Sequence, residues 1–307
     1  MKIYLAIGGG LTANMIATGE LPLWIQRTKR RLFSYHYFHT ADNRAQEDPL
    51  YCARVLKLDM FLDSGAFSAM MLGSPITCEQ YAEFIHNTKD DIPWSVLSSL
   101  DEIGRGEEAA RKSYENLKVL ESLGCRVAPV FHVREPDHWL KKYLDEGYEY
   151  ILIGGLVKEN VDFARVRLDH LWEHYLTDAA GRARCKVHGF GLTVQSLMFR
   201  YPWYSVDSSS WIKYAAYGHT VFRIGNGYRT IQTSEKSSAR RKLTGYHYDT
   251  LPAAMREKVD EWFAHHGFTA EQAKDYNYRS AINAAVFQEL EDYGIEQFKI
   301  DQPLLFT

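Results

Sequence analysis

Three aspartates, Asp63, Asp101 and Asp207, each come directly after a short apolar run. Such runs are typical of β-strands, and the carboxyl ends of parallel strands meet at one rim, where α/β proteins bind ligands. Two carboxylates can divide the work at an acetal carbon, because one attacks the carbon while the other protonates the leaving group. The three aspartates therefore predict a shared active site for glycosyl chemistry. The alternative for each of them is a helix cap or a salt-bridge partner.

Other residues suited to binding a nucleobase also stand at the ends of predicted strands. His132 ends another predicted strand, and Gly154 and Gly155 end the next one. A glycine pair lets backbone N–H groups approach a carbonyl oxygen closely. A buried carboxylate suits a ligand with two adjacent donors, such as N1–H and the 2-amino group of guanine, and the ring of Phe67 can stack on a base. The alternative for Phe67 is an ordinary core aromatic.

Apolar runs alternate with amphipathic segments along the first two-thirds of the chain. The runs predict strands at 2–8, 32–38, 60–63, 94–100, 126–131, 150–153, 186–190 and 204–206. Helical spacing of apolar residues predicts helices at 48–57, 78–89, 107–123, 137–146, 161–176 and 193–199. Strands that alternate with helices imply parallel βαβ units, so the sequence predicts an α/β fold in the form of a closed (β/α)8 TIM barrel.

The pattern changes after Asp207. The predicted elements there are an extra β-hairpin with strands at 220–224 and 228–233, and C-terminal helices at 253–266 and 269–293 with a break near 275–278. We interpret residues 1–307 as a single barrel domain. Its parts are a core barrel at 1–210, which carries the active-site strand ends, and a substrate-contacting loop with the C-terminal helices at 211–307.

The composition narrows the classes of protein that the chain can belong to. With 46% hydrophobic residues, its 307 residues hold enough apolar material for a large core. No apolar run approaches the roughly 18 residues of a membrane-spanning helix. The net charge of −3 provides no global basic field, so nucleic-acid binding would depend on a local patch. The basic run at 27–31 is interpreted as solvated surface rather than as that patch.

The four cysteines lie far apart in the sequence and form no C-x-x-C pair; they are Cys52, Cys78, Cys125 and Cys185. We therefore expect free thiols in a reducing cytoplasm and no metal site.

The order of the strand-end motifs resembles a known family. The motifs are LDSGAF at 62–67, SLDE at 99–102, IGGL at 153–156, KVHGFG at 186–191 and VDS at 206–208. Through them, about two-thirds of the chain resembles the tRNA-guanine transglycosylase superfamily of (β/α)8 barrels. It is most similar to the shorter phage and bacterial members that modify DNA, the 7-deazaguanine DNA transglycosylases.

This resemblance implies roles for individual residues. Asp207 corresponds to the nucleophile that forms a covalent glycosyl intermediate, and Asp63 corresponds to the general acid/base. Asp101 corresponds to the carboxylate that reads the donor edge of guanine. The remaining implied base contacts are the stacking ring of Phe67, the backbone donors of Gly154 and Gly155, and His132, which stands where the family places a glutamine.

Two features of the tRNA-modifying relatives are missing. Their Cys-x-Cys-x-x-Cys zinc motif has no counterpart because no cysteine follows Cys185, and we find no equivalent of the archaeal RNA-binding domain. Both differences favour DNA over tRNA. The segment after the eighth strand interleaves Tyr228, Tyr246 and Tyr248 with the cations Arg223, Arg229, Lys236, Arg240, Arg241 and Lys242. Cations and rings together suit a flipped or single-stranded substrate, whereas the alternative is a solvated loop.

The resemblance implies a base-exchange enzyme that replaces guanine in DNA with a free 7-deazaguanine base of the preQ0 type. The partners would be DNA and the free base, with no membrane and no cofactor, in the cytoplasm or in the host cytoplasm if the chain is phage-encoded. The alternatives are tRNA-type base exchange in RNA, hydrolysis by a glycosidase or nucleosidase with the same carboxylate pair, and a non-catalytic nucleic-acid-binding barrel.

Overall fold

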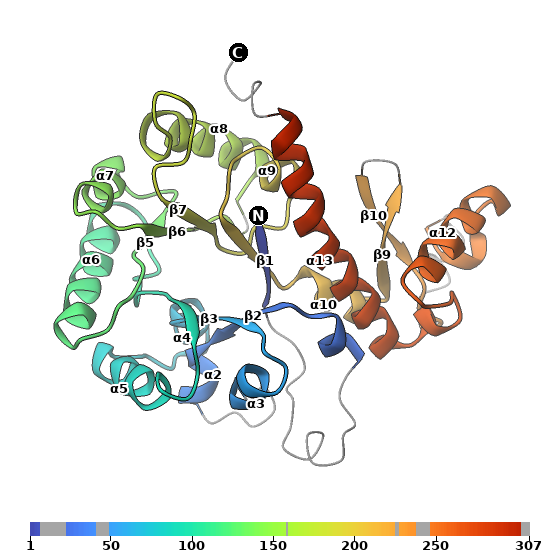
Figure 1. Ribbon diagram of the computed structural model, residues 1–307, viewed down its shortest axis with the longest axis horizontal. Helices are drawn as coiled ribbons and strands as arrows, with labels where there is room; N and C mark the ends of the chain where they lie inside the picture. The colour runs from blue at the N-terminus through green and yellow to red at the C-terminus, as the bar shows by residue number, and fades with distance from the viewer. Residues whose placement is uncertain (7–22, 41–48, 158, 225–226, 238–245, 302–307) are drawn as a thin grey trace. The chain divides into compact units, whose positions relative to one another are not determined.

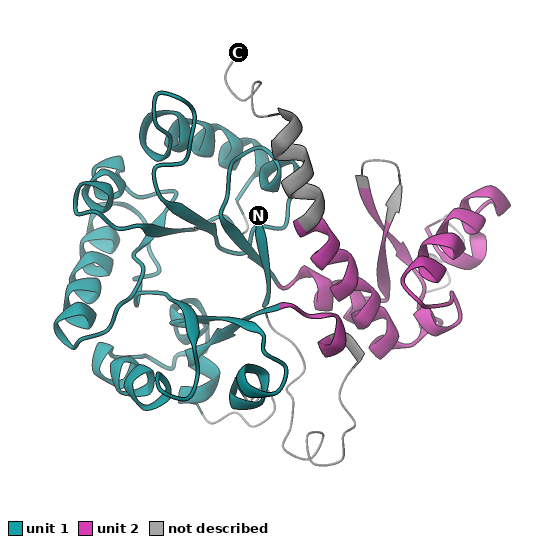
Figure 2. Ribbon diagram, viewed as in Figure 1, with its two compact units in different colours: residues 1–10, 30–208, 293–307 teal, residues 11–29, 209–292 magenta. Residues whose placement is uncertain are grey.

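The computed structural model describes residues 1–6, 23–40, 49–157, 159–224, 227–237 and 246–301 (Figure 1). The chain divides into two compact units, which are coloured separately in Figure 2. Unit 1 comprises 1–10, 30–208 and 293–307, and unit 2 comprises 11–29 and 209–292. The division after Ser208 lies two residues before the end of the predicted core at 210.

Unit 1 contains one curled sheet of eight parallel strands, which confirms the predicted parallel α/β class (Figure 1). The strands are β1 (Lys2–Ala6), β2 (Arg30–Ser34), β3 (Asp59–Asp63), β4 (Trp94–Leu97), β5 (Val130–His132), β6 (Tyr150–Gly154), β7 (Lys186–Gly189) and β8 (Ser205–Ser208). Their order in the sheet is β4-β3-β2-β1-β8-β7-β6-β5. Every neighbouring pair is parallel, so all eight carboxyl ends lie on the same edge of the sheet.

The two outer strands, β4 and β5, are connected at a single point. Ser98 and Ala128 form an isolated parallel bridge between the segment that follows β4 and the segment that precedes β5. The N–H of Ala128 donates to the carbonyl of Leu97, and the N–H of Ser99 donates to the carbonyl of Ala128, both at 2.8 Å. The other neighbouring strands of the sheet are joined by ladders of two or more residue pairs. Within the described residues, β4 and β5 are linked by this bridge instead.

Helices follow most of the strands of unit 1 (Figure 1). They are α2 (Tyr35–His39), α3 (Pro49–Arg54), α4 (Ala66–Leu72), α5 (Cys78–Thr88), α6 (Gly106–Ser122), α7 (Asp137–Asp145), α8 (Val161–Leu171) with the π-helical turn η2 (Trp172–Leu176), and α9 (Gln195–Met198). The start of α5 confirms its predicted capping box, because Thr77 and Gln80 exchange side-chain-to-backbone hydrogen bonds of 3.3 and 3.0 Å.

The prediction of a strand at 32–38 is wrong in its second half, where α2 begins at Tyr35. Aromatic residues favour strands, but here their rings pack against α5. The Tyr35 ring lies 5.1 Å from that of Tyr81 and 5.0 Å from that of Phe84, and Phe38 stacks on Phe84 at 5.1 Å. Tertiary packing therefore overrides the local preference.

The interpretation of 27–31 as solvated surface is wrong for Arg31, which is only 1% exposed. Its guanidinium donates to the carbonyl of Leu5 on the neighbouring strand at 2.7 Å. A charged group is rarely buried without such a partner. This arginine therefore contributes to the interior of the sheet and not to a nucleic-acid surface.

The inner face of the curled sheet is filled by apolar side chains. The cluster consists of Tyr4, Ala6, Leu32, Phe61, Val96, Val130 and Leu152. The rings of Tyr4 and Phe61 meet edge to face at 5.4 Å. This packed core supports the rim at the carboxyl ends of the strands, where the predicted site residues lie.

Unit 2 confirms the predicted hairpin and C-terminal helices. Its elements are η1 (Leu23–Arg27), α10 (Ser210–Ala216), β9 (His219–Ile224), β10 (Gly227–Gln232), η3 (Tyr248–Thr250), α12 (Ala253–His265), η4 (Gln272–Lys274) and α13 (Tyr276–Asp301), the last of which extends into unit 1. Asn283 of α13 receives the N–H of Val221 at 2.8 Å and donates to the carbonyls of Trp211 and His219. A buried amide thus connects α13 to the hairpin and to α10.

Across the described residues, none of the helices combines the length and the apolar character needed to cross a membrane.

Candidate functional site

The three predicted aspartates lie at one rim of the sheet. Asp63 is the last residue of β3, Asp207 is the third residue of the four-residue β8, and Asp101 lies in the segment after β4. Because the strands are parallel, these positions share the carboxyl edge. The charges of Asp101 and Asp207 both act on the carboxyl group of Asp63. The structure thus brings together the three residues that the sequence grouped.

Asp63 is partly exposed, and its surroundings disfavour the ionised form of its carboxyl group. Burial of its carboxyl group, followed by the negative charges of Asp101 and Asp207, raises its pKa to about 7. Two hydrogen bonds oppose this rise: Oδ2 accepts from the N–H of Gly65 at 3.1 Å, and Oδ1 accepts from the hydroxyl of Ser98 at 3.4 Å. Asp63 is therefore a carboxyl group that exchanges its proton near neutral pH.

Gly65 allows the chain to turn directly after Asp63. Its φ of +78° lies in the left-handed region, and a Cβ there would stand 2.6 Å from Cβ of His36 and 2.7 Å from Oγ of Ser34. A side chain at this position would displace the backbone donor that Asp63 uses. Local geometry explains why the motif needs glycine here.

Asp207 is 6% exposed and is held through one of its two oxygens. Its Oδ1 accepts a 2.7 Å hydrogen bond from the N–H of Gly191 and lies 3.3 Å from Nε2 of His188. In the part of the chain that the structure describes, no hydrogen bond reaches Oδ2. The carboxyl group is thus oriented through Oδ1.

His188 is a site residue whose role the sequence analysis did not identify. It is fully buried on β7, and its Nδ1 lies 2.6 Å from Oγ of Ser205, which in turn lies 2.5 Å from the hydroxyl of Tyr150. Burial lowers its pKa, although the hydrogen bond and charge of Asp207 oppose this effect. A neutral imidazole can therefore orient Asp207 without neutralising it. The available signal was a histidine inside an otherwise apolar strand.

Asp101, His132 and Glu135 form a second cluster at the rim. Nε2 of His132 lies 2.9 Å from Oδ2 of Asp101, and its Nδ1 lies 3.6 Å from Oε1 of Glu135. The backbone N–H of His132 donates to Oε2 of Glu135 at 3.1 Å. Sequence analysis missed Glu135, which is 3% exposed, because nothing in the local pattern marks it as buried.

The charged groups of this cluster shift the pKa values of His132 and Glu135. Burial alone would lower the pKa of His132, but the hydrogen bond and charge of Asp101, with the charge of Glu135, raise it. Burial raises the pKa of Glu135 to about 7, and the charge of Asp101 adds to that rise, while His132 opposes it. The acidic neighbours of His132 therefore favour its protonated form.

Asp101 is already engaged by the protein at both oxygens. Oδ2 faces His132, and Oδ1 accepts a 3.4 Å hydrogen bond from the hydroxyl of Ser64. An ionised carboxylate has about four acceptor sites, so each oxygen can still accept a donor from a ligand. Reading two donors of a base is chemically compatible with this arrangement.

Gly154 supports His132 by leaving space for its ring. A Cβ on Gly154 would stand 2.4 Å from Cδ2 and 2.9 Å from Nε2 of His132. Gly155 has a φ of +76°, a conformation that favours glycine. The sequence predicted the glycine pair as backbone donors to a base, and that role stays a prediction beside the steric one.

Phe67 lies in the first turn of α4 and is 47% exposed. The alternative of a core aromatic is therefore wrong. The same short helix exposes Met70, Met71 and Leu72 by half or more, so Phe67 belongs to an exposed apolar surface directly after the Asp63 turn. Its stacking on a base stays a prediction.

The basic residues predicted to bind DNA belong to unit 2 or fall outside the described residues. Arg223 lies on β9 and Arg229 on β10, where Arg229 is exposed, and the exposed Lys236 follows the hairpin. The other three, Arg240, Arg241 and Lys242, lie outside the residues that the structure describes. The predicted DNA-binding role of this segment stays a prediction.

Two pockets of similar size lie in unit 1, and neither encloses the Asp63–Asp207 pair. One, of about 640 Å3, is lined by residues of β4, by residues 124–128 and by the start of β6, towards the amino ends of the strands. The other, of about 610 Å3, borders Asp101 and lies against α4, α5 and α6. Neither lining includes Asp63 or Asp207. The chemistry of the rim, rather than pocket size, identifies the candidate site.

The rim combines a carboxyl group held through one oxygen, a second one whose pKa is raised to about 7, and a third one paired with histidine. The first two suit nucleophilic attack and general acid–base catalysis, and the third suits recognition of a ligand with hydrogen-bond donors. When compared with protein-family models and with curated proteins, the sequence matches none of them.

Proposed function

We propose that the protein is a transglycosylase that replaces guanine in DNA with a 7-deazaguanine base through a covalent aspartyl–glycosyl intermediate. Two lines of reasoning support the proposal. The motif series resembles the transglycosylase superfamily, and the residues that carry the motifs share one rim of the sheet. In this proposal, the curled sheet is a (β/α)8 barrel whose seam is the bridge between Ser98 and Ala128.

Asp207 is the proposed nucleophile. Its Oδ2 attacks C1′ of a deoxyguanosine, and the C1′–N9 bond breaks with its electron pair going to guanine. The Gly191 N–H and the neutral His188 hold Oδ1 and keep the carboxylate oriented during the attack. The product of this half-reaction is a glycosyl ester on Asp207.

Asp63 is the proposed general acid and base. In its protonated form it donates a proton to the departing guanine, and in its ionised form it accepts the proton from the incoming 7-deazaguanine as that base attacks C1′. The second attack restores the Asp207 carboxylate, and the two displacements give net retention at C1′. A pKa of about 7 makes both forms of Asp63 available at neutral pH.

The observation that carries the proposal is the contrast between these two coupled carboxyl groups. Asp207 has donors fixed on one oxygen, whereas Asp63 is destabilised as an anion by burial and by its acidic neighbours. Two carboxyl groups that act as nucleophile and as general acid need surroundings that differ in this way. Asp101 and His132 are the proposed base readers, Phe67 the stacking ring, and Gly154 and Gly155 the backbone donors.

The direct test uses the full chain with single-stranded or duplex DNA and a 7-deazaguanine base. We expect digestion and mass analysis to show the modified nucleoside, and denaturing electrophoresis to show a trapped protein–DNA adduct. Asp207→Asn should abolish both, since an amide is a poor nucleophile. Asp162→Asn, on the exposed face of α8, is the matched control and should retain both.

Full base exchange by the Asp207→Asn variant would contradict the proposal. Labelled guanine incorporated into tRNA but not into DNA would replace it with the RNA alternative. Release of free guanine without incorporation of a base would replace it with hydrolysis by the same pair of carboxylates.

A further inference from the structure

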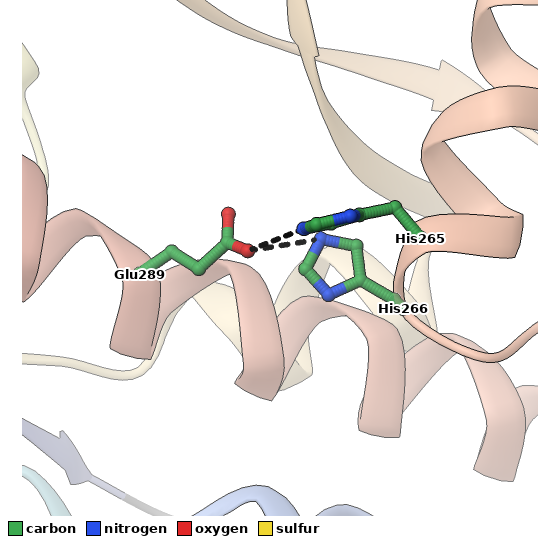
Figure 3. Close-up of side chains that lie close together, drawn as sticks. All are labelled: His265, His266 and Glu289. Atoms are coloured by element: carbon green, nitrogen blue, oxygen red, sulfur yellow. Dashed lines mark ion pairs between the residues drawn. The ribbon is translucent and has the colours of Figure 1, made fainter.

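Two histidines and a glutamate of unit 2 converge at the end of α12. His265 is the last residue of α12, His266 follows it, and Glu289 lies on α13 (Figure 3). One ligand atom from each residue lies within 4.8 Å of the other two. Nε2 of His266 is 3.4 Å from Oε1 of Glu289, and Nε2 of His265 is 3.8 Å from the same oxygen. Figure 3 shows both rings directed at the carboxylate.

The separation between His266 and Glu289 fits two ligands of a shared ion better than a hydrogen bond. A nitrogen–oxygen hydrogen bond is usually about 2.9 Å long. Two donors held by one tetrahedral Zn²⁺ with bonds of about 2.0–2.1 Å lie about 3.3 Å apart. The pair formed by His266 and Glu289, at 3.4 Å, is close to the second value.

The burial of His266 gives a second, independent reason to expect a bound ion here. Its side chain is 7% exposed, and its buried Nε2, the atom directed at Glu289, has no hydrogen-bond partner. A buried polar atom without a partner is costly, and buried ring nitrogens are almost always hydrogen-bonded or bound to a metal. An ion between the three side chains would satisfy this atom.

We propose that His265, His266 and Glu289 bind a Zn²⁺ ion that links the end of α12 to α13. Two imidazole nitrogens and one carboxylate oxygen are ligands that zinc prefers, and three protein ligands leave the fourth tetrahedral position for water. Neutral histidines with an ionised glutamate give the ligand set a charge of −1, which complements a dication. This site is separate from the proposed catalytic residues, all of which lie in unit 1.

The surroundings of His266 suit a metal ligand. Its ring packs against Trp262 at a centroid distance of 4.4 Å, and its carbonyl accepts a hydrogen bond from Arg27 of η1 at 3.4 Å.

The test is a zinc titration of the tag-free full chain after chelator treatment, followed by isothermal calorimetry and by competition with a chromogenic chelator. We expect one Zn²⁺ per chain and a rise in thermal midpoint on binding. His265→Ala and Glu289→Gln should each weaken binding by at least about 10-fold. Both positions are more exposed than His266, so these variants avoid the buried substitution.

Two control variants make the experiment specific. His174→Ala tests the surface pair of unit 1 in which the His170 and His174 rings lie 4.6 Å apart, and Glu257→Gln tests an exposed carboxylate of α12. Both should leave zinc binding unchanged. Asp207→Asn should also retain it, which separates this inference from the proposed function.

Two outcomes would overturn the proposal. The first is the absence of stoichiometric zinc binding by the native chain. The second is binding that survives both His265→Ala and Glu289→Gln, or that His174→Ala abolishes.

Discussion

Asp207 and Asp63 are coupled through charge: after burial and the charge of Asp101, the negative charge of Asp207 raises the pKa of Asp63. The proposed mechanism makes this coupling useful. When Asp207 becomes a glycosyl ester, its negative charge is lost, and the pKa of Asp63 falls. Asp63 would thus keep its proton before the intermediate forms and be ionised afterwards, which are the proton-donor and proton-acceptor forms that the two half-reactions require.

The first prediction concerns the pH dependence of adduct formation. This half-reaction needs the protonated form of Asp63, so its single-turnover rate should fall as pH rises through about 7. Quenched-flow sampling of the protein–DNA adduct between pH 5 and pH 9 measures this directly. A rate that is constant across that range would show that Asp63 is not the acid. Binding of DNA, measured in parallel, is the control for a pH effect on affinity.

The second prediction is that Asp63→Asn inactivates the protein but stabilises its fold above neutral pH. The native pKa of Asp63 is raised, so the unfolded chain releases this proton first, and stability falls as pH rises from about 4 to about 7. Asparagine does not ionise, so the variant avoids this loss of stability. The gain should grow across this window by about 4 kcal/mol and stay constant above it. Urea unfolding at pH 4, 6 and 8 measures the change.

Asp169 offers a control of opposite sign. Burial would raise its pKa, but hydrogen bonds from Arg200 and Tyr201 and the charge of Arg200 lower it. Its contribution to stability is present above the unfolded pKa and is lost in acid. Asp169→Asn should therefore destabilise the fold at neutral pH. If Asp63→Asn and Asp169→Asn shift stability in the same direction at pH 8, the electrostatic account of Asp63 is wrong.

The rim aspartates could be predicted because strand ends are a local property. Apolar runs that stop at Asp63 and Asp207 mark where strands end, and parallel pairing then places them on one edge. The strand predicted at 32–38 failed because the Tyr35 ring packs on α5, a contact between residues distant in the chain. Propensity carries no information about such partners.

The residues that support the site were harder to find for the same reason. Glu135 reads as an ordinary charged residue in a turn, yet the fold buries it against His132. His188 gains its role only when β7 and β8 pair and bring Asp207 to it. The cluster of His265, His266 and Glu289 forms because α12 and α13 meet, although Glu289 lies 23 residues after His266 in the sequence. The cluster contains no cysteine, so the spacing of the cysteines gives no sign of it.

The last prediction tests whether Gly154 serves the site by making room for His132. A Cβ at Gly154 would stand 2.4 Å from the His132 ring, so Gly154→Ala should push the imidazole away from Asp101 and cost about 1–3 kcal/mol of stability. His132→Ala removes the ring, so the same glycine substitution should cost much less in that background. Urea unfolding of the two single variants and the double variant gives the coupling energy, expected at about 0.5–3 kcal/mol. Strict additivity would mean that Gly154 is needed for another reason, such as the backbone donor role implied by the family resemblance.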